Sequence, residues 1–160
     1  MTISNTIMIG VFSGLLASIA FLLLSKFINL ILIPWYQNII YNGTNVEGTW
    51  KTTKTFSNGS KQETILFIKQ NATLISASVT VVKTNQGEVT IIKNFKFKGI
   101  LKERFLCISG QNIDNKQIGF VSSLLEVKSG GKELEGVESW YDVASNSIQS
   151  INATYMRDNT

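Results

Sequence analysis

The sequence predicts an N-terminal transmembrane α-helix, of one or two spans, followed by an all-β domain. We expect that domain to close as an eight-stranded antiparallel up-and-down β-barrel, lipocalin-like in shape. The first observation is the charge distribution: of 15 Lys and Arg and 11 Asp and Glu in 160 residues, only Lys26 lies within residues 1–40. The second is the later part of the chain, where short strand-like runs recur without a helical apolar period. The third is the Gly, Asn and Ser turn chemistry between those runs.

Residues 1–40 form the predicted membrane domain. No charge interrupts the stretch from Thr6 to Leu24, and about 20 apolar residues suffice for a helix to cross a bilayer core of about 30 Å. A cleaved signal peptide fits less well, because the first six residues contain no basic side chain. Gly10, Gly14 and Ser18 are four residues apart, so they share one face, on which we expect another helix to pack.

The segment after Leu24 allows two topologies. Pro34, Trp35 and Tyr36 are typical of an interfacial helix at the end of one span. Alternatively, two short spans turn near Ser25 and Lys26. With one span, the Lys and Arg bias predicts that the barrel lies in the cytoplasm. Four Asn-x-Ser/Thr triplets also occur, which we attribute to chance in a chain rich in these residues.

Residues 46–158 form the predicted barrel domain. Each expected strand is a run of β-forming residues that ends at a turn signal, such as Asn58-Gly59 after the first and Gly130-Gly131 after the sixth. Links this short require antiparallel neighbours, and eight strands close naturally into a barrel without free edges. The expected strands, in order, are Gly48–Phe56, Gln62–Lys69, Leu74–Lys83, Val89–Lys98, Phe105–Ile113, Ile118–Lys128, Glu133–Tyr141 and Ser147–Arg157.

The first strand begins with Gly48-Thr49-Trp50, which resembles the Gly-x-Trp motif of lipocalin-type barrels. That resemblance implies that Trp50 closes one barrel end and that a basic residue of the last strand packs over it. Arg157 is placed for this role, in which a guanidinium over an indole face gains cation–π attraction. We interpret Gly48, Trp50 and Arg157 as closure residues first, and Trp50 and Arg157 as ligand contacts second.

A basic run and several aromatic rings supply the candidate ligand-binding residues. Basic side chains attract phosphate or an anionic lipid surface, although a solvated barrel face also explains them. Aromatic rings either pack in the core or stack on a base. The candidates are Lys93, Lys96, Arg104, Trp140, Tyr141, Tyr155 and Arg157.

The sequence lacks the residues that several kinds of catalytic and metal site require. The sequence contains no His and a single Cys, Cys107, so His-based catalysis, an internal disulfide and a cysteine metal cluster are excluded. We expect no catalytic residue, no metal and no cofactor, and therefore a protein that is not an enzyme.

A membrane segment followed by a small eight-stranded barrel resembles the membrane effectors of bacterial antiphage signalling. These are the CBASS effectors with transmembrane helices and a minimal β-barrel, and their relatives in the Panoptes defence system. The resemblance implies the bacterial inner membrane. Proteins of this family usually have two clear membrane helices, whereas the second apolar segment here is short and contains Pro34. The segments that carry the resemblance are Val46–Trp50, Phe97–Gly99, Gly119–Phe120, Lys132–Gly136, Ser139–Asp142 and Ile148–Ser150.

The resemblance implies that the barrel binds a cyclic di- or trinucleotide made by a partner nucleotidyltransferase. Ligand binding would control homo-oligomerisation of the membrane segment and thereby membrane disruption, with cell death or growth arrest; in the Panoptes relatives the nucleotide holds the effector inactive. DNA or RNA duplexes are not expected partners. The alternatives are a membrane-tethered barrel that binds a lipid or other apolar ligand, and a solidly packed barrel that binds other proteins.

Overall fold

The computed structural model describes residues 3–114, 119–143 and 145–158. The chain divides into two compact units, residues 1–41 and residues 42–160. The first is helical and the second is the barrel, and each is described by itself.

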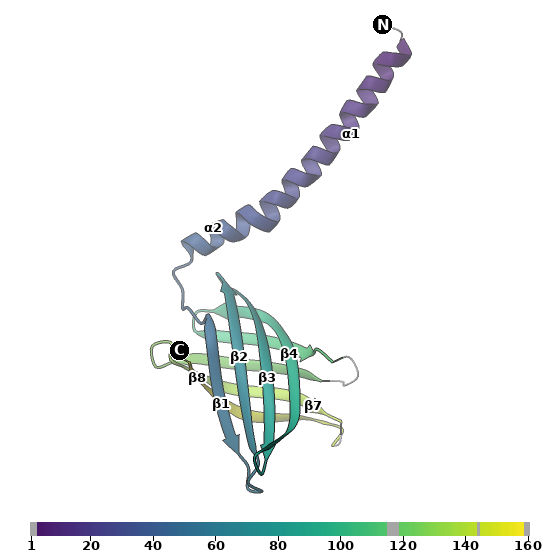
Figure 1. Cartoon of the computed structure of the whole chain (residues 1–160). Coiled ribbons are helices and arrows are strands. Elements are labelled where there is room, and N and C mark those ends of the chain that lie inside the picture. Colours follow the sequence, from purple (N-terminus) through teal and green to yellow (C-terminus); the bar gives the residue numbers. More distant parts are fainter. Residues whose placement is uncertain (1–2, 115–118, 144, 159–160) are drawn as a thin grey trace. The chain divides into compact units, whose positions relative to one another are not determined.

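The helical unit is one uninterrupted helical segment. Helix α1 (Ile3–Phe27) continues through a π-helical turn (Ile28–Leu32) into α2 (Ile33–Ile40), as Figure 1 shows. In the π turn the Ile33 N–H donates to the Ile28 carbonyl, one residue further back than in an α-helix. Because Pro34 has no N–H to donate, this local widening lets the helix pass the proline without a break.

The helix is long and apolar enough to cross a membrane. Its candidate span, Ile7–Ile40, has 34 residues, and an 18-residue window within it has a mean hydropathy of 2.5. At 1.5 Å per residue it is about 50 Å long, more than a bilayer core requires. The helix continues through Ser25 and Lys26, and the Asn29 side-chain amide donates to the Ser25 carbonyl at 2.9 Å. The structure therefore contains one long helix here, and not two spans that turn at these residues.

The second unit is a closed barrel in which every strand pairs antiparallel with its sequence neighbours and β8 pairs with β1. This confirms the predicted fold class. The strands are β1 (Gly48–Thr55), β2 (Lys61–Asn71), β3 (Leu74–Asn85), β4 (Glu88–Lys102), β5 (Phe105–Asn112), β6 (Phe120–Lys128), β7 (Glu133–Asp142) and β8 (Ser147–Arg157). The main difference from the prediction is β4, which continues through Gly99 to Lys102; the predicted start of the sixth strand, Ile118, lies outside the described residues.

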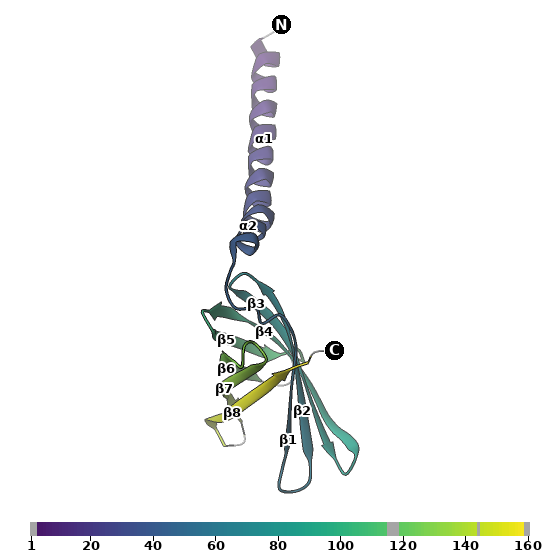
Figure 2. The same cartoon turned by 90° about the vertical axis from the view of Figure 1, so that its left-hand side faces the viewer.

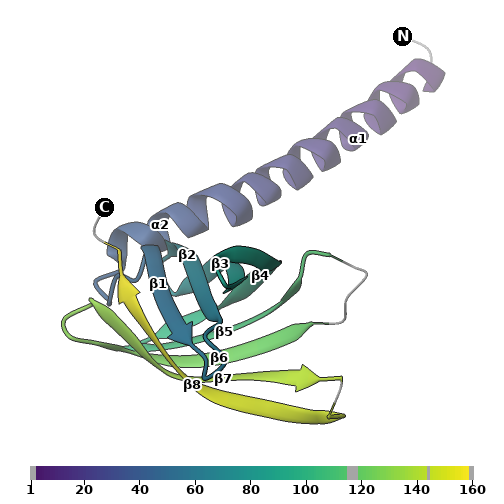
Figure 3. The same ribbon diagram turned by 60° about the horizontal axis from the view of Figure 1, so that its bottom comes forward.

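The barrel closes unevenly. Strands β1 and β8 pair only at Trp50–Arg157 and Lys51–Met156, and beyond these pairs they diverge (Figure 2, Figure 3). Strand β4 likewise meets β5 only from Phe95 onward, so the tip of the β3–β4 hairpin has a neighbour on one side only. One end of the barrel is therefore tightly closed and the other is open.

The core fills the closed end. Alternate side chains of each strand point inward, and the fully buried ones include Trp50, Leu66, Leu101, Leu125 and Leu134. Two glycines let neighbouring strands approach closely: a Cβ at Gly99 would lie 2.0 Å from the Cys107 carbonyl oxygen, and one at Gly136 would lie 2.0 Å from that of Leu124. The packed core leaves the open end of the barrel hollow.

Candidate ligand-binding site

Trp50 and Arg157 close one barrel end. Trp50 has no exposed surface, and the Arg157 guanidinium carbon lies 5.4 Å from its ring centroid. Arg157 also donates to the carbonyl oxygens of Asn45 at 3.4 Å and Gly131 at 3.3 Å, and to that of Glu47. This is the contact that the Gly-x-Trp resemblance implies, so we assign Arg157 to closure of the barrel.

A second set of hydrogen bonds fixes the chain before β1 across the same end. The indole N–H of Trp50 donates to the Val46 carbonyl at 2.9 Å, and the Val46 N–H donates to the Gln70 side-chain oxygen at 2.8 Å. The Gln70 amide nitrogen donates to the carbonyls of Thr44 and Ala72. These bonds satisfy the polar groups that would otherwise be buried without partners at the closed end of the barrel.

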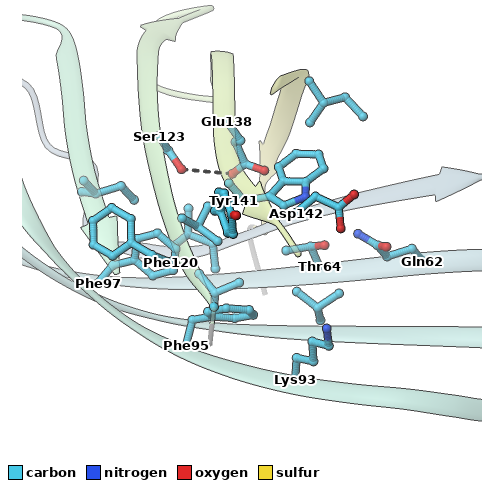
Figure 4. Close-up of a pocket in the computed structure, with 18 of the residues that line it drawn as sticks. Gln62, Thr64, Lys93, Phe95, Phe97, Phe120, Ser123, Glu138, Tyr141 and Asp142 are labelled. Carbon is cyan, nitrogen blue, oxygen red and sulfur yellow. Dashed lines mark hydrogen bonds between the residues drawn. The ribbon is translucent and has the colours of Figure 1, made fainter. Parts of the chain in front are cut away.

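The open end holds a cavity of about 690 Å³ (Figure 4). Small-molecule sites usually have volumes of roughly 300–1,000 Å³ and walls that are mainly apolar with a few polar groups. Most of the lining is apolar or aromatic, and ionisable groups come from four strands. The lining residues are Lys54, Phe56, Gln62, Thr64, Leu66, Val79, Val81, Lys93, Phe95, Phe97, Ile108, Gly119, Phe120, Val121, Ser123, Glu138, Trp140, Tyr141, Asp142, Val143, Ile151 and Tyr155.

A carboxylate lies among these apolar walls. Glu138 Oε1 accepts a hydrogen bond from the Tyr155 hydroxyl at 2.7 Å and another from the Ser123 hydroxyl at 3.3 Å. Both donors are almost completely buried, with 2% and 1% of their surface exposed, and they come from the strands on either side of β7. The two hydroxyls hold the carboxylate in one orientation inside the cavity.

Tyr155 keeps its proton in this position. Burial, followed by the charge of Glu138 and the hydrogen bond to it, raises the pKa of the Tyr155 hydroxyl far above its ordinary value. The hydroxyl therefore remains a donor to Glu138 over the physiological pH range.

The cations of the cavity come from β1 and β4. Lys93 lies on the same face of β4 as Phe95 and Phe97 and extends into the cavity (Figure 4). Lys54 also lines the cavity, and its Nζ donates to the Asn152 carbonyl at 3.1 Å, across the gap where β1 and β8 do not pair. The other lining carboxylate, Asp142, accepts from Ser145 in the β7–β8 turn.

The structure brings four of the seven candidate residues together: Lys93, Trp140, Tyr141 and Tyr155 line the cavity. The other three do not reach it. Lys96 is exposed and alternates with the inward Phe95 and Phe97. Arg104 lies at the closed end, where it pairs with Glu126 at 3.0 Å, and Arg157 covers Trp50. The seven residues therefore do not form one site.

The sequence reasoning missed Lys54 and Glu138. Both follow from strand alternation, because Lys54 shares the inward face of β1 with Trp50, and Glu138 shares that of β7 with Leu134. The two-residue period of side chains along each strand could have placed both residues on an inward face. Without the strand register, however, a charged residue in a strand is assigned to the solvent face by default.

The small residues of the helix lie on its exposed surface. A Cβ at Gly10 or Gly14 would meet nothing within 4 Å, and the Ser18 hydroxyl donates to the Gly14 carbonyl of its own helix at 2.9 Å. Helix packing through Gly10, Gly14 and Ser18 stays a prediction.

No group of three His, Cys, Asp or Glu side chains in the described part of the chain is arranged to hold a metal ion. Comparison with known protein families, with curated proteins and with solved structures finds no match to this chain. The arguments about function therefore start from the helix, the barrel and its cavity.

Proposed function

We propose that this protein is a membrane-anchored sensor whose barrel binds a cyclic oligonucleotide. The observation that carries the proposal is the cavity of about 690 Å³, which combines aromatic rings, two lysines and an oriented carboxylate. Its volume lies within the usual range of small-molecule sites.

A cyclic dinucleotide has two phosphates and two bases, and the cavity offers a partner for each kind of group. Lys54 and Lys93 come from different strands and supply a positive charge for each phosphate. Trp140 and Phe95 supply aromatic rings for base stacking, which is worth about 1–3 kcal/mol per base. No catalytic step is required of a protein that acts through binding.

The output of such a sensor would be assembly in the membrane. If the liganded barrel favours a different association state, ligand binding shifts the population of helix clusters. In keeping with the resemblance to CBASS and Panoptes effectors, we propose that this assembly disrupts the bacterial inner membrane and causes cell death or growth arrest. The nucleotide would come from a partner nucleotidyltransferase, and the barrel would lie in the cytoplasm.

The second candidate ligand is a lipid or another apolar molecule. The specific observation in its favour is that most of the lining side chains are apolar, including Phe95, Phe97, Phe120 and Val79. The third possibility, a solidly packed barrel that only binds proteins, is not compatible with a cavity of this volume.

Isothermal titration of the full chain in detergent against a panel of cyclic di- and trinucleotides tests the proposal. We expect one panel member to bind at micromolar concentration or below, because each stacked base and paired phosphate adds affinity. Native mass spectrometry on the same sample examines the second candidate. A folded barrel that binds no panel member but retains a lipid through purification would replace the first proposal with the second.

A further inference from the structure

Hydroxyls from both flanking strands hold Glu138 inside the cavity. Ser123 lies directly opposite it on β6, and Tyr155 reaches it from β8. Figure 4 shows the Ser123–Glu138 hydrogen bond and the carboxylate among the lining side chains. A carboxylate on the protein surface is solvated by water and needs no such hydrogen bonds from the protein. The two hydroxyls therefore point to a role for Glu138 inside the cavity.

The hydrogen bonds divide the two carboxylate oxygens between protein and cavity. A carboxylate offers about four acceptor positions, two on each oxygen. Tyr155 and Ser123 both donate to Oε1, so they occupy that oxygen. Within the described residues no buried side-chain oxygen lacks a partner, and no donor reaches Oε2. Oε2 is therefore open to the cavity, with both of its acceptor positions available.

The four bases differ in what they offer to such an oxygen. Guanine presents two adjacent donors, N1–H and the 2-amino group, on its Watson–Crick edge. Adenine and cytosine present one amino group beside a ring-nitrogen acceptor, and uracil presents one N–H between two carbonyl acceptors. A hydrogen-bond acceptor of the base that lies beside the carboxylate has no donor and is repelled by the negative charge. When such a pair of acceptors is buried, it opposes binding. Enzymes that hold an unpaired base in a pocket read this same edge by hydrogen bonds.

We infer that Glu138 is the specificity-determining residue of the cavity and that it selects guanine as the base of the bound cyclic nucleotide. The inference rests on the proposed function and adds the identity of a base to it. Lys54 and Lys93 contact the phosphates, and Oε2 of Glu138 accepts from the two adjacent donors of one guanine.

Isothermal titration of the full chain in detergent with two ligands tests the selection without altering the protein. Cyclic di-IMP differs from cyclic di-GMP only by the absence of the 2-amino group. We expect cyclic di-GMP to bind about ten- to a hundredfold more tightly than cyclic di-IMP. This is the range for the loss of one of the two hydrogen bonds in a bidentate contact to a base. Cyclic di-AMP and cyclic di-UMP, which each place an acceptor beside the carboxylate, are also expected to bind more weakly than cyclic di-GMP.

The variant Glu138→Gln connects the selection to this carboxylate. Its single side-chain oxygen keeps the hydrogen bonds from Tyr155 and Ser123, which turns the amide N–H₂ toward the base as a donor facing donors. The preference for cyclic di-GMP over cyclic di-IMP should then fall to about threefold or less. Glu135→Gln, on the outward face of the same strand, makes the same exchange outside the cavity and should keep the preference.

The outcomes separate this inference from the proposed function. Equal binding of cyclic di-GMP and cyclic di-IMP by the native chain, or an unchanged preference in Glu138→Gln, overturns the role of Glu138 while nucleotide binding stands. Absence of binding by every cyclic nucleotide to the folded chain overturns the proposed function and the inference together.

Discussion

Replacement of Arg157 by alanine tests whether this residue closes the barrel. The substitution removes the guanidinium from the face of Trp50 and takes a charged donor from three backbone carbonyls. A cation–π contact at a partly desolvated site contributes about 1–2 kcal/mol. Two of the hydrogen bonds are long, at 3.3 and 3.4 Å, so all three together add about 1 kcal/mol rather than the full value for charged donors. The expected loss in the free energy of unfolding is therefore about 2–3 kcal/mol.

The assay is thermal unfolding of the full chain in detergent, followed by near-UV circular dichroism. For a domain of this size, the loss corresponds to a decrease in Tm of roughly 10 °C. Arg157→Met separates charge from packing, because methionine still covers the indole but donates nothing; most of the decrease should remain. The matched control is Arg104→Met at the same barrel end. Arg104 makes an exposed ion pair with Glu126 and lies 5.8 Å from the centroid of the Phe105 ring, and at this exposed site the two contacts together contribute about 1 kcal/mol.

Two results would refute the reasoning. One is an Arg157→Ala protein with unchanged Tm, and the other is an Arg104→Met protein that loses as much as Arg157→Ala. If Arg157→Ala instead kept its Tm but lost affinity for the ligand, Arg157 would be a ligand contact and not a closure residue.

Two further predictions concern the β7–β8 side of the barrel. Gly136→Ala should lower the free energy of unfolding, measured with urea, by about 3 kcal/mol or more, because the new Cβ would lie 2.0 Å from the Leu124 carbonyl oxygen. The control is Gly59→Ala, at a glycine with φ +78 but open space around it, which should lose only about 1 kcal/mol. Spectrophotometric titration should find that Tyr155 stays protonated well above pH 10.0, since burial and Glu138 raise its pKa. Because the folded-state pKa exceeds the unfolded value of 10.0, this group costs no stability below pH 10 and lowers it as the pH rises above 10. Tyr155→Phe should make urea unfolding between pH 8 and 11 less pH-dependent, and an unchanged dependence would contradict the assignment.

The elements of this fold were predictable because their signals are local. Charge-free length defines the helix, and turn residues such as Asn58-Gly59 and Gly130-Gly131 separate the strands. The π turn could not be predicted in the same way, because a proline within an apolar helix is compatible with a stop, a kink or a widened turn. One and two spans stayed open for a different reason, because the polar Ser25 and Lys26 interrupt the apolar run.

The candidate site was only partly predictable, because distance along a strand and register decide which charges meet. Lys93 and Arg104 belong to one basic run, yet the ten residues from Lys93 to Lys102 along β4 span about 30 Å, so these charges lie at opposite barrel ends. Lys96 differs from Lys93 by an odd number of residues and so faces outward. The uneven closure between β1 and β8, which opens the cavity, depends on long-range pairing that no local pattern records.

The central claim is that the open-end cavity binds a cyclic oligonucleotide, and a pair of lysine variants tests it most directly. Lys93 lines the cavity and Lys96 lies on the outer face of the same strand, so Lys93→Ala and Lys96→Ala remove the same charge from inside and outside the barrel. In isothermal titration with the nucleotide that the native full chain binds, we expect Lys93→Ala to weaken binding about tenfold or more and Lys96→Ala to weaken it less than about twofold. Equal losses from the two variants, or no loss from Lys93→Ala, would contradict binding in this cavity.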